Sequence, residues 1–266
     1  MKAKILFLFL LCSYSAMSQE LYVSTEPASN MAKNSIGIRL ANEGIFKPQF
    51  QSRFVPEIMF GVSKNLMVHT SAYVSDFYQA NQKFEGYSLY AKYRFFTIDS
   101  IKKHLRAAVY GRFSDIKNPA YADEINLEGD NSGLQGGLVV TQLLHRVALS
   151  GSVSYNKRLD NRGEPMSGID LPDNSIAYTF STGYLAYPKV YTSYKQPNLN
   201  LYVEFLGKSN PGRSQNFMEV APAIQLILNS TTRIDLSKRV ELWSNMTRMT
   251  KNMYLVRLEY NFFNVL

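Results

Sequence analysis

The sequence predicts an all-β fold, a transmembrane antiparallel β-barrel of about twelve strands with short turns at one end and longer loops at the other. Apolar and polar residues alternate one by one through segments of about ten residues, which is typical of membrane strands. After Leu11, no apolar run approaches the roughly 18 residues of a membrane helix. Because backbone polar groups must be paired inside a bilayer, a closed barrel is then the remaining way to span it.

The first residues have the pattern of a secretory signal peptide. Lys2 and Lys4 precede an apolar run over residues 5–11. Ala16 and Ser18 supply the small residues of a cleavage site, so we expect the signal peptide to end at Ser18. Cys12 leaves a lipoprotein open as an alternative. The bulky residue before Cys12 favours ordinary cleavage instead.

Cys12 is the single cysteine, so the predicted mature chain has none and cannot be held by disulfides. Removing Lys2 and Lys4 from the 29 basic residues leaves 27 against 21 acidic residues, a formal charge of +6. The arginines do not cluster with aromatic residues on one segment. This distribution argues against a nucleic-acid partner.

Alternation is clearest between His104 and Ser114, where apolar and polar side chains occupy opposite faces. The same rule, applied throughout, predicts strands at 34–42, 50–62, 66–78, 85–96, 103–115, 132–144, 146–158, 175–187, 196–207, 216–229, 231–244 and 251–264.

The predicted connections alternate in length, with short turns at 63–65, 97–102, 144–146 and 229–231 and longer polar loops at 116–131, 159–174 and 208–215. An even strand number with this alternation places both termini on the periplasmic side. A secreted soluble β-sandwich is the rival interpretation. Strand length favours the membrane barrel, and so do aromatic residues at the strand ends, namely Phe95, Phe96, Tyr187, Tyr260 and Phe262.

The last predicted strand, from Tyr254 to Phe263, alternates strictly and the sequence stops at Leu266. It resembles the C-terminal recognition strand of bacterial outer-membrane proteins, which implies the barrel-assembly machinery as a partner. With the segment Glu26–Met31, the chain resembles uncharacterised outer-membrane barrels of the Bacteroidota type. That resemblance implies an architecture and no activity.

Strand parity predicts which charged residues face the barrel interior, the lumen. Eleven are basic and six acidic: Arg39, Arg53, Lys92, Arg94, Arg106, Arg112, Arg146, Arg158, Arg233, Arg239 and Arg257, with Glu57, Glu204, Glu219, Asp235, Glu241 and Glu259. Charges facing lipid cost a few kcal/mol each at the bilayer midplane, so their shared parity supports the assignment. Lys238 breaks the parity.

Two functions fit such a lumen. The basic surplus predicts a porin-like or transporter-like channel for small polar or anionic solutes, with Arg94, Arg106, Arg112 and Arg257 among the lining residues. Alternatively, the charges pair across the interior and the barrel is a closed structural or surface-interaction protein. A barrel of twelve strands is larger than those whose interior is filled by side chains and smaller than those with an open water channel. Barrel size therefore does not decide between the two functions.

Catalysis is a weaker hypothesis. His69 and Ser71 share a strand face, similar to the His-x-Ser pair of outer-membrane phospholipases, but no residue is identified that would orient His69 as a base. We therefore predict no enzyme, no catalytic residues and no cofactor.

No metal site is predicted either. His69, His104 and His145 lack short-range ligand spacing. The acidic loop residues Asp115, Asp123, Glu124, Glu128 and Asp130 have the oxygen ligands that suit divalent cations bridging lipopolysaccharide, and an ordinary solvated loop is the expectation we favour.

The predicted organisation is a removed signal peptide at 1–18, a periplasmic or lumen segment at 19–33, and an integral outer-membrane barrel at 34–266. Its expected surroundings are outer-membrane lipids and lipopolysaccharide.

Overall fold

The computed structural model describes residues 22–100, 103–159, 170–190, 193 and 195–266. The predicted signal peptide and Cys12 lie outside these residues.

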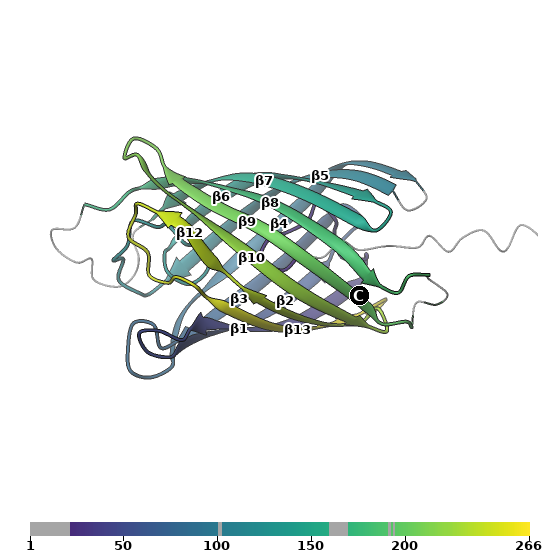
Figure 1. Cartoon of the computed structure of the whole chain (residues 1–266), viewed down its shortest axis with the longest axis horizontal. Helices are drawn as coiled ribbons and strands as arrows, with labels where there is room; N and C mark the ends of the chain where they lie inside the picture. The colour runs from purple at the N-terminus through teal and green to yellow at the C-terminus, as the bar shows by residue number, and fades with distance from the viewer. Residues whose placement is uncertain (1–21, 101–102, 160–169, 191–192, 194) are drawn as a thin grey trace, which may run out of the picture.

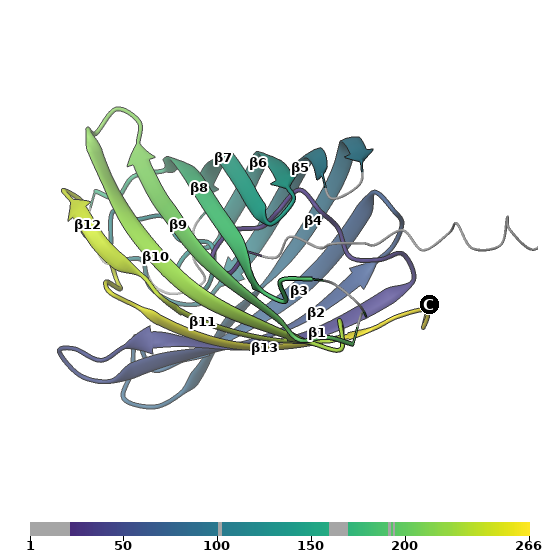
Figure 2. The ribbon, with the colours of Figure 1, turned by 45° about the vertical axis from the view of Figure 1, so that its right-hand side comes forward.

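The described chain forms one closed antiparallel barrel (Figures 1 and 2). From β1 to β11 each strand pairs with the next along the chain, β12 pairs with β10, and β13 pairs with β11 and with β1 to close the ring. The strands are β1 (Ser35–Ile45), β2 (Gln51–Gly61), β3 (Leu66–Ser75), β4 (Lys83–Ser100), β5 (Lys103–Ile116), β6 (Gly133–Leu144), β7 (Val147–Arg158), β8 (Asn174–Tyr187), β9 (Asn198–Asn210), β10 (Gln215–Leu228), β11 (Thr232–Lys238), β12 (Val240–Ser244) and β13 (Tyr254–Phe262).

Strands β11 and β12 are two halves of one crossing, so the barrel has twelve strands, as predicted. Both halves pair with β10. The ladder is interrupted at Arg239, whose backbone N–H donates to the carbonyl of Met253 instead of to a neighbouring strand. The predicted strand 231–244 is therefore broken at one residue, and the all-β barrel prediction is confirmed.

Two irregularities in β4 change which side chains face inward. Its register shifts against β3 between Tyr73 and Val74, and against β5 between Arg94 and Phe96. Each shift reverses the alternation beyond it. Glu85 is consequently buried in the barrel, and Asp99 reaches Arg106. Strict alternation along β4 had placed neither carboxylate inside.

Short turns gather at one end of the barrel, here the turn end, and longer loops at the other, the loop end. At the turn end, Asn229 and Ser230 both adopt positive φ, as a tight hairpin between right-twisted strands requires. Two connections depart from the predicted alternation. Residues 188–197 make a long connection at the turn end, and residues 211–214 make a short one at the loop end.

The outer face of the barrel is apolar. Alternate side chains such as Leu40, Leu138 and Leu258 are about half exposed. The predicted aromatic residues at the strand ends are exposed too, and at the loop end the ring of Phe46 packs against that of Tyr254 with ring centroids 4.8 Å apart. An apolar band between aromatic girdles is the surface that lipid favours. Among the described residues, no helix is long and apolar enough to cross a membrane.

Lys238 stands on this outer face, but not in its middle. It pairs in register with Tyr254, in the aromatic cluster near the loop end. A lysine at that level reaches the polar interface with its ammonium group while its methylene stem stays apolar.

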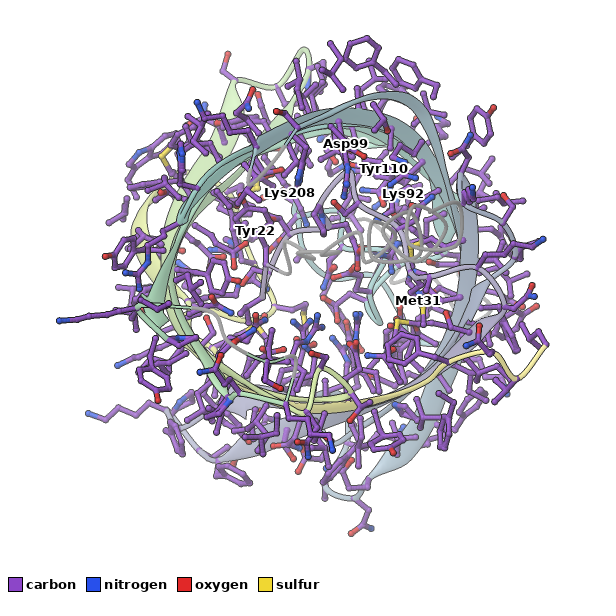
Figure 3. The ribbon with its side chains drawn as sticks, turned by 90° about the vertical axis from the view of Figure 1, so that its right-hand side faces the viewer. Tyr22, Met31, Lys92, Asp99, Tyr110 and Lys208 are labelled. Atoms are coloured by element: carbon purple, nitrogen blue, oxygen red, sulfur yellow. The ribbon has the colours of Figure 1, made fainter. Side chains whose placement is uncertain are left out.

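The inside of the barrel is filled mainly by polar and charged side chains. Residues 22–33, here called the plug segment, run inside the ring of strands, and Tyr22 and Lys92 lie within it in the view down the axis (Figure 3). Tyr22 and Val23 are 2% and 3% exposed and pack against Leu143, Ala148 and Tyr202. The sequence left open whether residues 19–33 lie in the periplasm or in the lumen. The described residues of this segment lie in the lumen.

Candidate functional site

The lumen is the candidate functional site, because it gathers almost all of the charged residues that parity had placed inside. Those that form ion pairs within it are Arg39, Arg53, Glu57, Lys92, Arg106, Arg112, Glu219, Arg233, Asp235, Arg239, Glu241, Arg257 and Glu259.

A chain of ion pairs follows the inner face where the barrel closes. Arg39 of β1 lies 2.7 Å from Glu57 and 2.8 Å from Glu259. Arg233 links Glu259, at 2.7 Å, to Asp235, at 3.1 Å. Because these groups are nearly or fully buried, removing one would leave a partner charge unpaired. The chain fixes the register of β11, β13, β1 and β2.

The start of the plug segment is held by one buried carboxylate. Glu204 of β9 is 0% exposed and accepts hydrogen bonds from the backbone N–H groups of Val23 and Ser24, at 2.9 and 2.8 Å. It also accepts from the hydroxyls of Thr25 and Ser181. Arg257 completes this anchor, since its guanidinium donates to the carbonyl of Val23 at 2.9 Å.

The rest of the plug segment is held from the opposite wall. Lys92 donates to the carbonyl of Pro27 at 2.7 Å, and Arg106 donates to the hydroxyl of Ser29 at 2.9 Å. The N–H of Ala28 donates to Thr141 at 2.8 Å. The segment therefore bridges β9 and β13 on one side and β4, β5 and β6 on the other.

Glu26 of the plug segment faces two cations and a cavity. Its carboxylate lies 3.3 Å from Lys92 and 3.7 Å from Arg39. Burial alone would raise the pKa of Glu26, but Lys92, Arg39 and His69 outweigh it and lower the pKa from 4.5 to about 2. Glu26 is thus ionised in the lumen at neutral pH.

The long loop between β5 and β6, residues 117–132, folds into the other end of the barrel. The fully buried guanidinium of Arg53 lies 2.6 Å from Asp130 of this loop and 2.7 Å from Glu85 of β4. Arg112 lies 2.6 Å from Glu128. We call residues 117–132 the inner loop. The expectation that it is an ordinary solvated loop is wrong, because Glu124 and Asp130 are buried and because Glu128 and Asp130 pair with lumen arginines.

A latch joins the inner loop to residues 245–253, the loop between β12 and β13. Glu124 lies 2.8 Å from both Lys208 of β9 and Arg248. Thr247 donates to Asp123 through its N–H, at 2.9 Å, and its hydroxyl, at 2.7 Å. Burial would raise the pKa of Glu124, yet Lys208 and Arg248 lower it from 4.5 to about 2.

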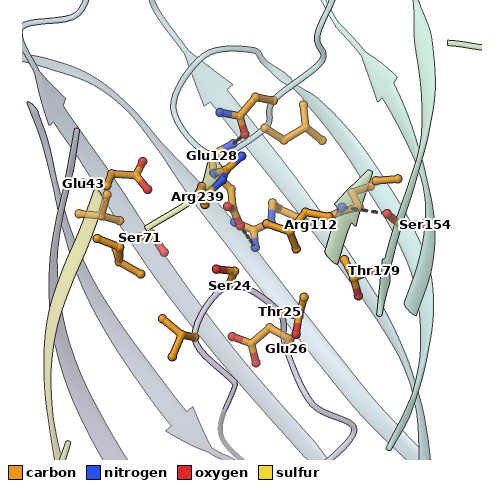
Figure 4. A pocket seen from close by; sticks show the side chains of 18 of the residues that line it. Ser24, Thr25, Glu26, Glu43, Ser71, Arg112, Glu128, Ser154, Thr179 and Arg239 are labelled. Carbon is orange, nitrogen blue, oxygen red and sulfur yellow. Dashed lines mark hydrogen bonds and ion pairs between the residues drawn. The ribbon is translucent and has the colours of Figure 1, made fainter. Parts of the chain in front are cut away.

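Between the plug segment and the inner loop lies a cavity of ≈ 270 Å³ (Figure 4). Ser24, Thr25 and Glu26 form one boundary, while Arg112 and Glu128 form another. A second cavity of ≈ 30 Å³ lies beside Pro27 and Lys92. In the described residues, the lumen is therefore a chamber of mixed polar and apolar lining, narrowed by two inserted segments.

The basic surplus predicted for the lumen is offset by acidic residues that sequence reasoning had not placed there. Strand alternation could not assign these acidic residues to the lumen. Glu26 and the acidic residues of the inner loop lie outside any strand, and Glu43 lies one residue beyond a predicted strand end. Glu85 lies at the bulge in β4. Conversely, Lys208 and Arg248 are further cations of the lumen. Because these groups pair with one another, the predicted basic surplus is not present inside the barrel.

Two arginines from the predicted lining lie at the turn end. Arg146 precedes β7, and its guanidinium donates to the carbonyls of Leu185, Ala186 and Pro188. Arg94 donates to the carbonyl of Lys64 at 2.7 Å. Both satisfy backbone groups where strands end, and neither borders the larger cavity. Arg158, at the loop end, donates to the carbonyl of Leu171.

The structure supplies a carboxylate beside the His69–Ser71 pair. Glu57 Oε2 lies 2.8 Å from His69 Nδ1 and accepts a hydrogen bond of 2.6 Å from the Ser71 hydroxyl. The Ser71 hydroxyl therefore donates its hydrogen bond to Glu57 rather than to the imidazole, which is not the arrangement of a hydrolase triad. Among the described residues, no group of three or more His, Cys, Asp or Glu side chains is arranged to hold a metal ion.

No protein-family model and no curated protein matches the sequence. Solved structures that resemble the chain include a KdgM porin, with a TM-score of 0.48 and 11% identity over 86% of this chain and 99% of that one. A bacterial polysaccharide outer membrane secretin has a TM-score of 0.45 and 9% identity over 87% of this chain and 100% of that one. OprD of Pseudomonas aeruginosa has a TM-score of 0.40 and 8% identity over 91% of this chain and 98% of that one. The likeness is one of fold.

Proposed function

We propose that the protein is an integral outer-membrane barrel of the porin-like kind, which passes small polar solutes through its lumen. The apolar outer face with its aromatic girdles supports the membrane location. The observation that carries the transport proposal is the cavity of ≈ 270 Å³, lined by charged and hydroxyl side chains together with apolar ones, inside a closed ring of strands.

The pairing of charged residues in the lumen affects which charge of solute the barrel favours. Arg112, a predicted channel-lining residue, is paired with Glu128, and Arg257 is paired with Asp235. A pathway lined by paired charges attracts neither ion sign strongly. We therefore propose neutral or weakly charged polar solutes, where the basic surplus of the sequence had favoured anions.

Conductance of the purified protein in a planar bilayer tests this proposal. We expect steady steps of small size, because two inserted segments narrow the lumen, and a reversal potential near zero in a KCl gradient. The variant Glu204→Ala, which releases the plug segment, should conduct more. A bilayer that stays sealed with both proteins contradicts the proposal.

A closed structural barrel is the second candidate, favoured by the ion pairs that tie the plug segment and the inner loop to the walls. It predicts no conductance from either protein. It also predicts that Arg233→Met lowers the free energy of unfolding by about 3–5 kcal/mol, because Glu259 and Asp235 lose a buried partner.

A further inference from the structure

One wall of the larger cavity carries a row of aromatic rings from three neighbouring strands. The ring of His69 on β3 lies 4.2 Å from that of Tyr90 on β4, centroid to centroid, and Tyr90 lies 5.7 Å from Tyr110 on β5. Tyr110 leans over Gly137 of β6, where an added Cβ would stand 2.5 Å from its ring. Glycine at this position therefore leaves room for the last ring of the row.

Polar atoms beside this row lack partners. The Tyr90 hydroxyl, His69 Nε2 and Arg112 Nε make no hydrogen bond to the residues that the structure describes. Their side chains belong to residues that are 3%, 5% and 9% exposed, and all three residues line the cavity. Asn156 Oδ1 on β7 is in the same condition. Buried polar groups are normally satisfied, so these four atoms are available to a ligand that enters the cavity.

The wall next to the aromatic row is built from small neutral polar side chains. Ser152 of β7 shares a hydrogen bond of 2.7 Å with Thr179 of β8, and Gln135 of β6 donates to Ser154 at 3.1 Å. Ser154 and Thr179 appear at one side of the cavity in Figure 4. Each hydroxyl both donates and accepts, so this wall can bind hydroxyl groups of either orientation.

The charges around the cavity argue for a neutral ligand. Arg39 is shared among three carboxylates, Arg112 is paired with Glu128, and Arg239 is paired with Glu219. An anionic or cationic ligand would have to displace one of these partners, whereas a neutral one would not.

From these features together we propose that the cavity binds a neutral saccharide of one or two sugar rings. The C–H face of a sugar packs on aromatic rings, whose faces carry negative charge, and its hydroxyls match the unpaired donors and acceptors. A volume of ≈ 270 Å³ falls just below the usual range of about 300–1,000 Å³ for small-molecule sites, which limits the ligand to this size. The inference rests on the proposed function, since the cavity lies in the solute path.

Titration calorimetry on the full mature chain in detergent tests the site, with D-glucose, maltose and gluconate as probes. We expect saturable binding of a neutral sugar and none of gluconate, which is anionic. Tyr110→Ala should weaken the binding about tenfold, the upper end of an aromatic contribution. Tyr90→Phe keeps the ring and removes the unpaired hydroxyl, and should weaken it several-fold. The control Tyr93→Ala alters the outer face of the same strands and should bind normally.

A parallel bilayer experiment separates the two proposals, because a bound sugar should reduce the current through the channel. Steady conductance with neither binding nor block overturns the saccharide site and leaves transport standing. Binding without conductance leaves the site and removes transport. Preference for gluconate, or equal binding by Tyr90→Phe and the natural protein, overturns the neutral saccharide assignment.

Discussion

At the scale of single residues, Glu204 anchors the plug segment, a role that strand parity cannot predict. Alternation places its side chain inside the barrel, and the structure confirms that it is buried. Its described partners are backbone and hydroxyl donors of the plug segment and Ser181 rather than cations. A charged acceptor strengthens each of these hydrogen bonds, so one carboxylate fixes the beginning of the plug segment.

Glu204→Ala should free the plug segment from β9. Hydrogen bonds to a charged group contribute about 1.5–3 kcal/mol each, so we expect the segment to lose about 3 kcal/mol or more of local stability. Hydrogen exchange of the amides of Val23 and Ser24 measures this directly. The control Glu241→Ala removes a carboxylate at the loop end. Unchanged protection of the two amides in Glu204→Ala would show that other contacts hold the segment.

At the scale of elements, the inner loop depends on pH through Glu124. Its pKa is lowered to about 2 in the folded protein, against 4.5 for an ordinary glutamate. A group with a lowered pKa contributes stability above its unfolded pKa and loses it as the pH falls towards the folded value. A shift of this size corresponds to about 3 kcal/mol for the latch.

We therefore expect the inner loop to stay closed at neutral pH and to open between about pH 4.5 and pH 2. Pepsin digestion through this range, with cleavage within residues 117–132 as the readout, measures the opening. Glu124→Gln lacks the titrating carboxylate of the latch, so the pH dependence of its cleavage should be weaker than that of the natural protein. An inner loop in the natural protein that resists pepsin equally at pH 2 and pH 4.5 would exclude the latch.

Elements also show where sequence reasoning succeeds and where it stops. The two-residue period placed the strands within a few residues, because one face must be apolar and the other polar. It failed at Glu85, where a bulge reverses parity, and at Arg146, whose side chain serves strand ends. It had no access to Glu26 or the inner loop, because segments without regular structure carry no periodic signal. The strands and most of their inward charges were therefore predictable, and the two segments inserted into the lumen were not.

At the scale of the whole molecule, the outer face carries the claim of membrane insertion. Leu138 lies in the middle of β6, 49% exposed, between the outward-facing Val109 and Val153 of the neighbouring strands. Leu138→Arg should destabilise the folded barrel in lipid by about 2–4 kcal/mol, as arginine does at the bilayer midplane. Urea unfolding in lipid vesicles measures this loss. Val190→Arg, in the connection at the turn end, should change it little, and equal effects would count against a lipid-facing band.

The central claim is that the plug segment governs passage through the barrel, and a reversible cross-link tests it most directly. The Thr25 and Ser181 hydroxyls lie 2.8 Å apart, and the predicted mature chain has no cysteine, so Thr25→Cys/Ser181→Cys should form a single disulfide between the plug segment and β8. Single-channel current is then recorded on the same bilayer before and after reduction. We predict a small or absent current when the disulfide is formed and a clear rise when it is reduced. A large current that is identical in both states would contradict the account.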